Sequence, residues 1–106
     1  MNNNKILGLI GFAAKARKIC YGADSVEQEI KKKKVYLVLV ANDASDRTKE
    51  KFIKLCEQYN INFMIYSEIN LISKAIGKSN KAIIGIEESN LASEIQKIND
   101  GGEFIG

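Results

Sequence analysis

The sequence contains no histidine, proline or tryptophan, and only two cysteines, Cys20 and Cys56. Without histidine, the chain has no imidazole to act as a base near neutral pH or to ligate a metal ion. Two cysteines cannot supply a four-cysteine zinc site, and because both lie among apolar residues we expect buried, reduced thiols. We therefore expect no metal site and no cofactor. Without proline, turns must be made by glycine, asparagine, aspartate and serine.

Long apolar runs are also missing, because no stretch approaches the roughly 18 residues that a membrane-spanning helix needs. The N-terminal stretch has an apolar patch without the charged segment and longer apolar run of a secretion signal. We therefore expect a cytoplasmic protein with no membrane partner. The 106 residues, 45% of them hydrophobic and 27% charged, predict one globular domain over residues 1–106. Residues 100–106 show no periodicity and are expected to form a frayed tail.

The first third of the chain has the pattern helix, strand, helix. Apolar residues recur at helical spacing up to a basic tip at residues 15–18. A short β-prone piece at residues 19–21 is followed by Gly22, which interrupts the regular pattern. Asp24 or Ser25 is then expected to cap a second helix.

The rest of the chain alternates between strands and helices. Residues 35–41 are continuously apolar, as expected of a central strand that is covered on both faces. Further strands are predicted at residues 62–66 and 82–86, and Ser67 is expected to cap the helix between them, which Gly77 ends. Strands separated by helices predict a sheet with helices on both faces, which is a three-layer α/β/α sandwich.

Two short motifs resemble nucleotide-binding or RNA-binding loops but lack the context of those loops. Residues 77–79 spell the end of a phosphate-binding P-loop, but Ile72 stands where the motif needs its first glycine. The predicted order of helix, loop and strand is also the reverse of the P-loop order. Gly8 and Gly11 have the spacing of the GxxG loop of KH domains, yet their apolar neighbours place them inside a helix, where small residues permit close packing.

Paired carboxylates, the usual groups for acid–base catalysis, occur as Glu87 with Glu88 and as Asp43 with Asp46. Both pairs stand where a helix is predicted to begin, and the helix dipole stabilises acidic side chains there. We interpret them as helix caps and expect no enzymatic activity.

The basic residues carry the strongest functional signal. Residues 1–34 have a net charge of +5, whereas the remainder has −2, which favours an anionic partner near the N-terminal third. The basic residues that follow the two predicted helices of this part are Lys15, Arg17, Lys18, Lys31, Lys32, Lys33 and Lys34. Between them, Gly22 and Ala23 open a helix whose free N–H groups suit a phosphate. Lys78 and Lys81 lie on a loop that the sandwich can bring to the same end.

The lysine run at residues 31–34 has two interpretations. In the first, folding gathers it with the other basic residues at one end of the sandwich, beside the bend at Gly22. In the second, it complements the negative C-terminal end of its own helix dipole.

The order and spacing of several motifs resemble those of a known family. These motifs are Leu7-Gly-Leu, Ala16-Arg17-Lys18, Tyr21-Gly22-Ala-Asp-Ser-Val26, the stretch from Leu37 to Ser45, Cys56 and Ala75-Ile-Gly-Lys78. They span most of the chain and are similar to bacterial YlxQ-like members of the ribosomal-protein family of kink-turn RNA binders, the L-seven-Ae family. The resemblance implies a mixed four-stranded sheet between helices, no catalytic activity, and a structured RNA (kink-turn or ribosomal RNA) as the partner. We also expect association with the ribosome, no DNA partner and a monomer.

The same resemblance implies which residues contact RNA. Family members place the start of the second helix in the widened groove of a kinked RNA helix. The corresponding residues of this chain are Gly22, Ala23, Asp24, Ser25 and Gln28. The loop that covers a flipped-out nucleotide corresponds to Lys78, Ser79, Asn80 and Lys81. The turn that faces the same RNA corresponds to Asn42, Asp43 and Ala44.

Three positions depart from the family pattern. Strong kink-turn binders have Asn and Glu in place of Asp24 and Ser25, and Lys in place of Gln28. An Asp carboxylate only accepts hydrogen bonds and is repelled by phosphate. Two alternatives therefore stay open, namely RNA binding through a helix start and a basic patch, or a protein-interaction module that kept the fold and lost specific kink-turn recognition.

Overall fold

The computed structural model describes the backbone of residues 2–101 and the side chains of residues 5–101. In chain order its elements are α1 (Asn2–Lys15), β1 (Ile19–Tyr21), α2 (Ala23–Lys31), β2 (Leu37–Val40), α3 (Asp46–Tyr59), β3 (Asn62–Ile65), α4 (Ile69–Ala75), β4 (Ile83–Ile86) and α5 (Ser89–Asn99). Every predicted strand is present, and three of the four are shorter than predicted. None of the described helices is long and apolar enough to cross a membrane.

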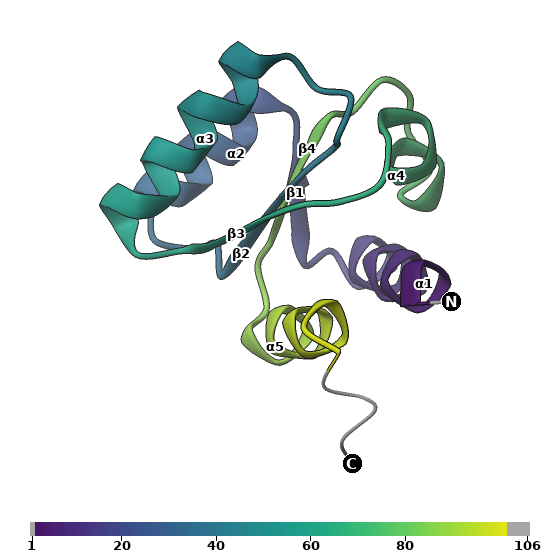
Figure 1. Cartoon of the computed structure of the whole chain (residues 1–106). Coiled ribbons are helices and arrows are strands. Elements are labelled where there is room, and N and C mark those ends of the chain that lie inside the picture. The colour runs from purple at the N-terminus through teal and green to yellow at the C-terminus, as the bar shows by residue number, and fades with distance from the viewer. Residues whose placement is uncertain (1, 102–106) are drawn as a thin grey trace.

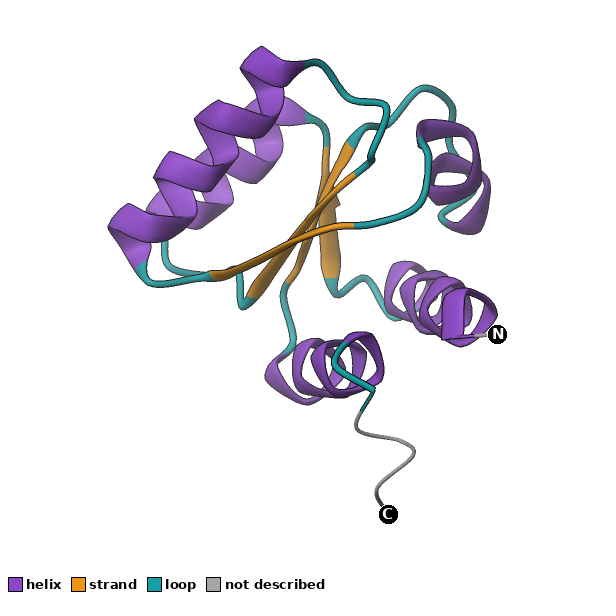
Figure 2. Ribbon diagram, viewed as in Figure 1, coloured by secondary structure: helices purple, strands orange, loops and turns teal. Residues whose placement is uncertain are grey.

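The strands form one mixed sheet in the order β1-β4-β2-β3. β4 is antiparallel to both of its neighbours, whereas β2 and β3 are parallel. Helices α2 and α3 cover one face of the sheet, and α1, α4 and α5 cover the other (Figure 1, Figure 2). The predicted three-layer α/β/α sandwich with a mixed four-stranded sheet is therefore confirmed.

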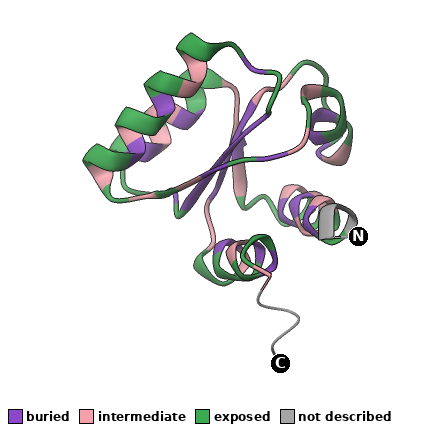
Figure 3. Ribbon diagram, viewed as in Figure 1, coloured by how far each residue is buried: buried purple, intermediate pink, exposed green. Residues whose placement is uncertain are grey.

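The two central strands are buried along their whole length, as the continuous apolar run predicted for β2. Alternate residues of β2 serve different helical layers. Leu37 and Leu39 pack in the core under α1, α4 and α5, whereas Val38 and Val40 pack in the core under α2 and α3. Buried residues accordingly follow the sheet and the inner faces of the helices (Figure 3).

Both cysteines are buried and unpaired, as predicted. Burial raises the pKa of the Cys20 thiol to about 12 and that of the Cys56 thiol to about 11. Neither is a thiolate near neutral pH, so neither has the reactivity of a catalytic or redox-sensing cysteine.

The start of α2 differs from its predicted cap. Gly22 is the N-cap residue and contributes no side-chain hydrogen bond. The prediction that Asp24 or Ser25 caps this helix is wrong, because both residues already lie in its first turn.

The start of α4 also differs from the prediction, because Ser67 does not cap it. Ser67 adopts a left-handed φ of 60° and Glu68 takes the N-cap position without a side-chain bond. Asp43 supplies the bond from the neighbouring loop, since its Oδ1 accepts the N–H of Ile69 at 2.9 Å. Asp43 therefore caps a different helix from the one that it precedes in sequence.

Of the remaining carboxylates, Glu88 is a cap as predicted, because its side chain accepts the N–H groups of Asn90 and Leu91 at 3.1 and 2.8 Å. Glu87 is not a cap. It is half-buried, its Oε2 has no hydrogen-bond partner in the described structure, and burial and the neighbouring Glu29 raise its pKa.

Helices α1 to α4 end in the same kind of turn, which closes on a residue with a left-handed φ. At α2, Lys34 N–H donates to the Glu29 carbonyl at 3.0 Å, and Lys33 N–H donates to the Ile30 carbonyl at 2.9 Å. The left-handed residues of these four turns are Arg17, Lys33, Asn60 and Gly77. Gly77 confirms the predicted helix end, whereas Arg17 and Lys33 carry side chains that make this conformation costly.

The predicted frayed tail falls mainly on residues 102–106, which lie outside the described residues. Asp100 and Gly101 are described, and they close α5 through the Gly101 N–H, which donates to the Ile98 carbonyl at 3.0 Å. These two residues therefore form the C-terminal end of α5.

Gly11 allows α1 to approach α4 closely. A Cβ atom at Gly11 would lie 3.1 Å from the carbonyl oxygen of Ala75, whereas one at Gly8 would meet nothing within 4 Å. The packing interpretation of the GxxG spacing therefore holds for Gly11.

We expect Lys33→Gly to raise the free energy of unfolding by about 0.5–1 kcal/mol, because glycine adopts the left-handed conformation without steric strain. Chemical denaturation of the two proteins measures the change. Lys33→Ala removes the same charge and keeps the strain, so it should bring no gain, and an equal gain for both variants would contradict the strain argument.

Glu27 ties α2 to α3, because its carboxylate pairs with Lys51 Nζ at 2.8 Å and Lys31 Nζ at 3.1 Å. These pairs lower the pKa of Glu27 below 4.5, so their contribution is present above pH 4.5 and is lost as the pH falls through the lower, folded-state pKa. We expect Glu27→Gln to cost about 0.5 kcal/mol at pH 7 and progressively less as the pH falls through the folded-state pKa of Glu27. Unfolding midpoints across this pH range test this, and a constant deficit at all pH values would rule out the ion pairs as its cause.

Candidate functional site

One end of the sheet gathers four segments that are far apart in sequence. Gly22 N–H donates to the Ile83 carbonyl at 3.0 Å, Ala41 N–H donates to the Ala82 carbonyl at 2.8 Å, and Asn42 N–H donates to the Ser67 carbonyl at 2.8 Å. We call this the loop end, made of residues 22–25, 41–45, 66–69 and 77–82. The start of α2, the turn before α3 and the loop before β4 therefore meet there, as the sequence analysis predicted for the helix start and for Lys78 and Lys81.

The start of α2 presents backbone donors that nothing else occupies. Gly22 has φ 88° and ψ 150°, a conformation essentially restricted to glycine. The first N–H of this helix that has a backbone acceptor is that of Val26, which donates to the Gly22 carbonyl at 3.0 Å. The N–H groups of Ala23, Asp24 and Ser25 have no acceptor in the described structure, and their side chains are exposed. Such a helix start favours a bound anion.

Tyr21 lies against two lysines of the loop between α4 and β4, residues 77–82, which we call the covering loop. Lys78 Nζ lies 5.4 Å and Lys81 Nζ lies 5.5 Å from the centroid of the Tyr21 ring. Both distances suit a cation–π interaction, which holds two ammonium groups over one half-buried ring. Two positive charges therefore lie close to Gly22.

Ser73 anchors this covering loop, and sequence reasoning missed it. Its hydroxyl accepts the Lys81 N–H at 2.7 Å and donates to the Lys81 carbonyl at 3.2 Å, while its own carbonyl accepts the Lys78 N–H at 2.8 Å. Ser73 is only 3% exposed. A serine in the apolar part of a short helix was the one available signal.

The other predicted residues of the loop end divide between surface and core. Asn42, Ser79 and Asn80 are exposed there, and Gln28 is exposed further along α2. Ala44 is buried, with 8% exposure, because it packs into the core under α2 and α3, so its side chain does not face the surface as expected. Asp43 is exposed, but one of its carboxylate oxygens holds the start of α4.

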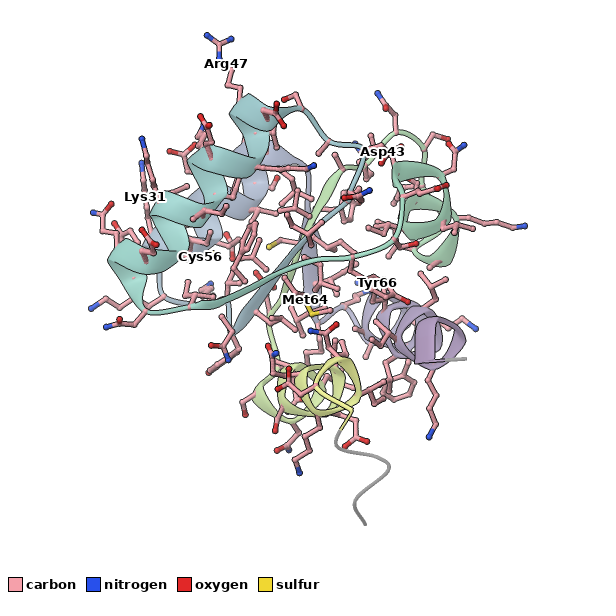
Figure 4. The ribbon with its side chains drawn as sticks, in the orientation of Figure 1. Lys31, Asp43, Arg47, Cys56, Met64 and Tyr66 are labelled. Atoms are coloured by element: carbon pink, nitrogen blue, oxygen red, sulfur yellow. The ribbon has the colours of Figure 1, made fainter. Side chains whose placement is uncertain are left out.

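Two basic residues near this end were not predicted. Arg47 extends into solvent from the first turn of α3, above the loop end (Figure 4). Lys74 lies in the last turn of α4 and lines the same hollow as Lys15. Arg17 lines the adjoining hollow with Tyr21 and Lys78.

Lys18 and the lysine run lie at the opposite end of the sheet. The Lys18 carbonyl accepts the Glu87 N–H at 2.7 Å, just beyond β4. The backbone N–H of Tyr36, which follows the lysine run, donates to the Ile86 carbonyl at 2.8 Å. Helix α2 carries the chain away from Gly22, because nine residues rise about 13 Å. Figure 4 shows Lys31 on the α2–α3 layer, well away from Asp43. The expectation that all basic residues gather at one end is therefore wrong for these five.

Acidic side chains partly neutralise that opposite end. Lys31 pairs with Glu27 at 3.1 Å and Lys32 pairs with Glu29 at 3.4 Å. The structure therefore agrees with the second interpretation of the lysine run, in which it completes the end of α2.

Comparison with known proteins supports the resemblance. A family model described as the ribosomal protein L7Ae/L30e/S12e/Gadd45 family matches residues 4–96. The RNA-binding protein YlxQ of Enterococcus faecium is 34% identical over 101 residues, which are 94% of this chain and 96% of that protein. The RNA-binding protein YlxQ of Bacillus subtilis (strain 168) is 28% identical over 92 residues, 87% of this chain and 92% of that protein.

Solved structures share the fold. A protein of unknown function from Bacillus halodurans superposes with a TM-score of 0.88 and 29% identity, covering 91% of this chain and 97% of that one. The 15.5kD RNA binding protein of Giardia lamblia superposes with a TM-score of 0.80 over 93% of this chain and 88% of that one, and at 21% identity it shows the fold alone. The match over residues 4–96, with relatives of nearly the same length, shows that the chain belongs to the ribosomal protein L7Ae/L30e/S12e/Gadd45 family.

Proposed function

We propose that this protein is a non-catalytic, cytoplasmic RNA-binding protein that recognises a structured, kink-turn-like RNA with its loop end and works in association with the ribosome. The observation that carries the proposal is the uncapped start of α2 at Gly22, flanked by the two lysines over Tyr21. The name RNA-binding protein, borne by both YlxQ relatives, and the family's ribosomal members support RNA as the partner.

The start of α2 would receive a phosphate of the bent RNA backbone. The N–H groups of Ala23, Asp24 and Ser25 have no acceptor in the described structure, and a Cβ at Gly22 would meet nothing within 4 Å. This open approach suits an RNA backbone, and the partial positive charge of the helix start stabilises the phosphate. Gly22 thus supplies the backbone bend before α2 and leaves space for an RNA backbone to approach the helix start.

The covering loop would close over a base that has left the stack. Unstacked bases are the usual points at which proteins read structured RNA. Ser79 and Asn80 are exposed between the two lysines that Tyr21 holds, so they can reach a base while the lysines contact the flanking phosphates. Ser73 keeps this loop in place from below.

Asp24 shapes the specificity of this site. Its exposed carboxylate only accepts hydrogen bonds, so it suits a base amino group and repels a nearby phosphate. We therefore expect recognition that depends on RNA shape and backbone more than on base identity.

The proposal predicts that the loop end binds RNA and the opposite end does not. Lys78→Gln with Lys81→Gln should lower the affinity for a kink-turn RNA about ten-fold at 0.1 M salt and reduce the salt slope by about 1.8, for two lost phosphate contacts. Lys32→Gln with Lys33→Gln removes the same charge at the opposite end and should change the affinity less than two-fold. Titration of labelled kink-turn RNA and a straight duplex of the same length, over a salt series, measures both.

Two results would overturn the proposed function. One is wild-type protein that binds neither RNA at low salt. The other is a cellular partner that stays bound after ribonuclease and high salt, which would favour the protein-interaction alternative.

A second prediction concerns Ser73. Ser73→Ala leaves the Lys81 N–H and carbonyl without partners and should cost about 1–2 kcal/mol of stability. Because the lysines remain, affinity for the kink-turn RNA should fall several-fold while affinity for the straight duplex stays unchanged. Ser93→Ala, at an exposed position of α5, is the matched control. Equal losses for both RNAs would show that the loop does not read shape.

A further inference from the structure

A groove follows the junction of α1 and α4, next to the loop end. Two adjoining hollows form it, and both are lined by Ala14 and Ile76. The first is also lined by Arg17, Ile19, Tyr21 and Lys78. The second is also lined by Gly11, Lys15, Lys74, Ala75 and Gly77. We call the two together the α1–α4 groove; it begins at Tyr21, the residue before Gly22.

The floor of the α1–α4 groove is made of small residues. Gly11 lets α1 approach the backbone of α4 so closely that a Cβ atom there would lie 3.1 Å from the Ala75 carbonyl. Ala14 and Gly77 continue the floor. The small side chains at the junction of α1 and α4 leave room for a polymer backbone to lie along it.

The charge of this groove is of one sign. Four of its lining residues are cationic, namely Lys15, Arg17, Lys74 and Lys78, and none of its lining residues is acidic. All four are exposed, and among the described residues none of them forms a salt bridge. The α2–α3 layer differs, because there Glu27 lies between Lys31 and Lys51. Beside the loop end, the surface between α1 and α4 therefore carries cations with no carboxylate among its lining residues.

We infer that the α1–α4 groove holds the sugar-phosphate backbone of an RNA stem that leaves the loop end, with Lys15 and Lys74 contacting its phosphates from opposite walls. The inference rests on the proposed function and gives the bound RNA a direction, across α1 and α4 and away from α2 and α3. A row of unpaired cations over small residues matches a chain of regularly spaced phosphates. Contacts of this kind fix the position of the RNA and read no sequence.

The test uses the full chain and two kink-turn RNAs that differ only in the length of one stem. For the long-stem RNA, Lys15→Gln with Lys74→Gln should lower the affinity about ten-fold at 0.1 M salt and the salt slope by about 1.8. Lys49→Gln with Lys54→Gln on α3 removes the same charge from positions without a salt bridge in the described structure and should change the affinity less than two-fold. Shortening the stem that lies in the α1–α4 groove should lower the RNA affinity of wild type about ten-fold. The same change should leave the RNA affinity of the Lys15/Lys74 variant unchanged.

The outcomes separate the two proposals. If wild type binds the kink-turn RNA but both double variants lose affinity equally, or if no stem can be shortened at a cost to wild type, the groove does not hold a stem and the inference is wrong. The proposed function then still stands. Wild type that binds neither RNA overturns the proposed function and this inference with it.

Discussion

The hydrogen bonds of β4 determine which surface segments are neighbours in this protein. β4 is the only strand of the described sheet that has an antiparallel neighbour on each side. Its first residues lie beside Gly22 and Ala41, and its last residues lie beside Lys18 and Tyr36. Because the four strands are short, this register and the parallel pairing of β2 with β3 together assign each loop to one end of the sandwich.

Gly85 permits that register. A Cβ atom at Gly85 would lie 2.8 Å from Cys20 Sγ and 3.2 Å from the methyl carbons of Val35. The space in the middle of β4 is therefore filled by neighbours from β1 and from the segment before β2. A larger residue would push these segments apart, and the two ends of the sheet would lose their alignment together.

The surface charge follows from the same arrangement. At the loop end, the lysines of the covering loop lie over Tyr21 and near an uncapped helix start. At the opposite end, Lys31 and Lys32 pair with Glu27 and Glu29 of their own helix. A net charge of +3 is thus spread over both ends, but only the loop end combines its cations with an uncapped helix start, and this combination suits a polyanion.

The sequence by itself determined the layers of the fold, since the apolar run of β2 and the alternation of helices and strands depend on local periodicity. It also identified the bend at Gly22, because no other residue type adopts that backbone conformation readily. The tertiary structure alone decided which charges meet, because the distance along α2 and the register of β4 separate Lys31 from Lys78. It also decided that Asp43 caps α4, that Ser73 holds the covering loop, and that Lys74 and Lys15 line the same hollow. These contacts join segments that are far apart in the sequence. No local sequence pattern predicts them, so they are defined only by how the folded chain packs.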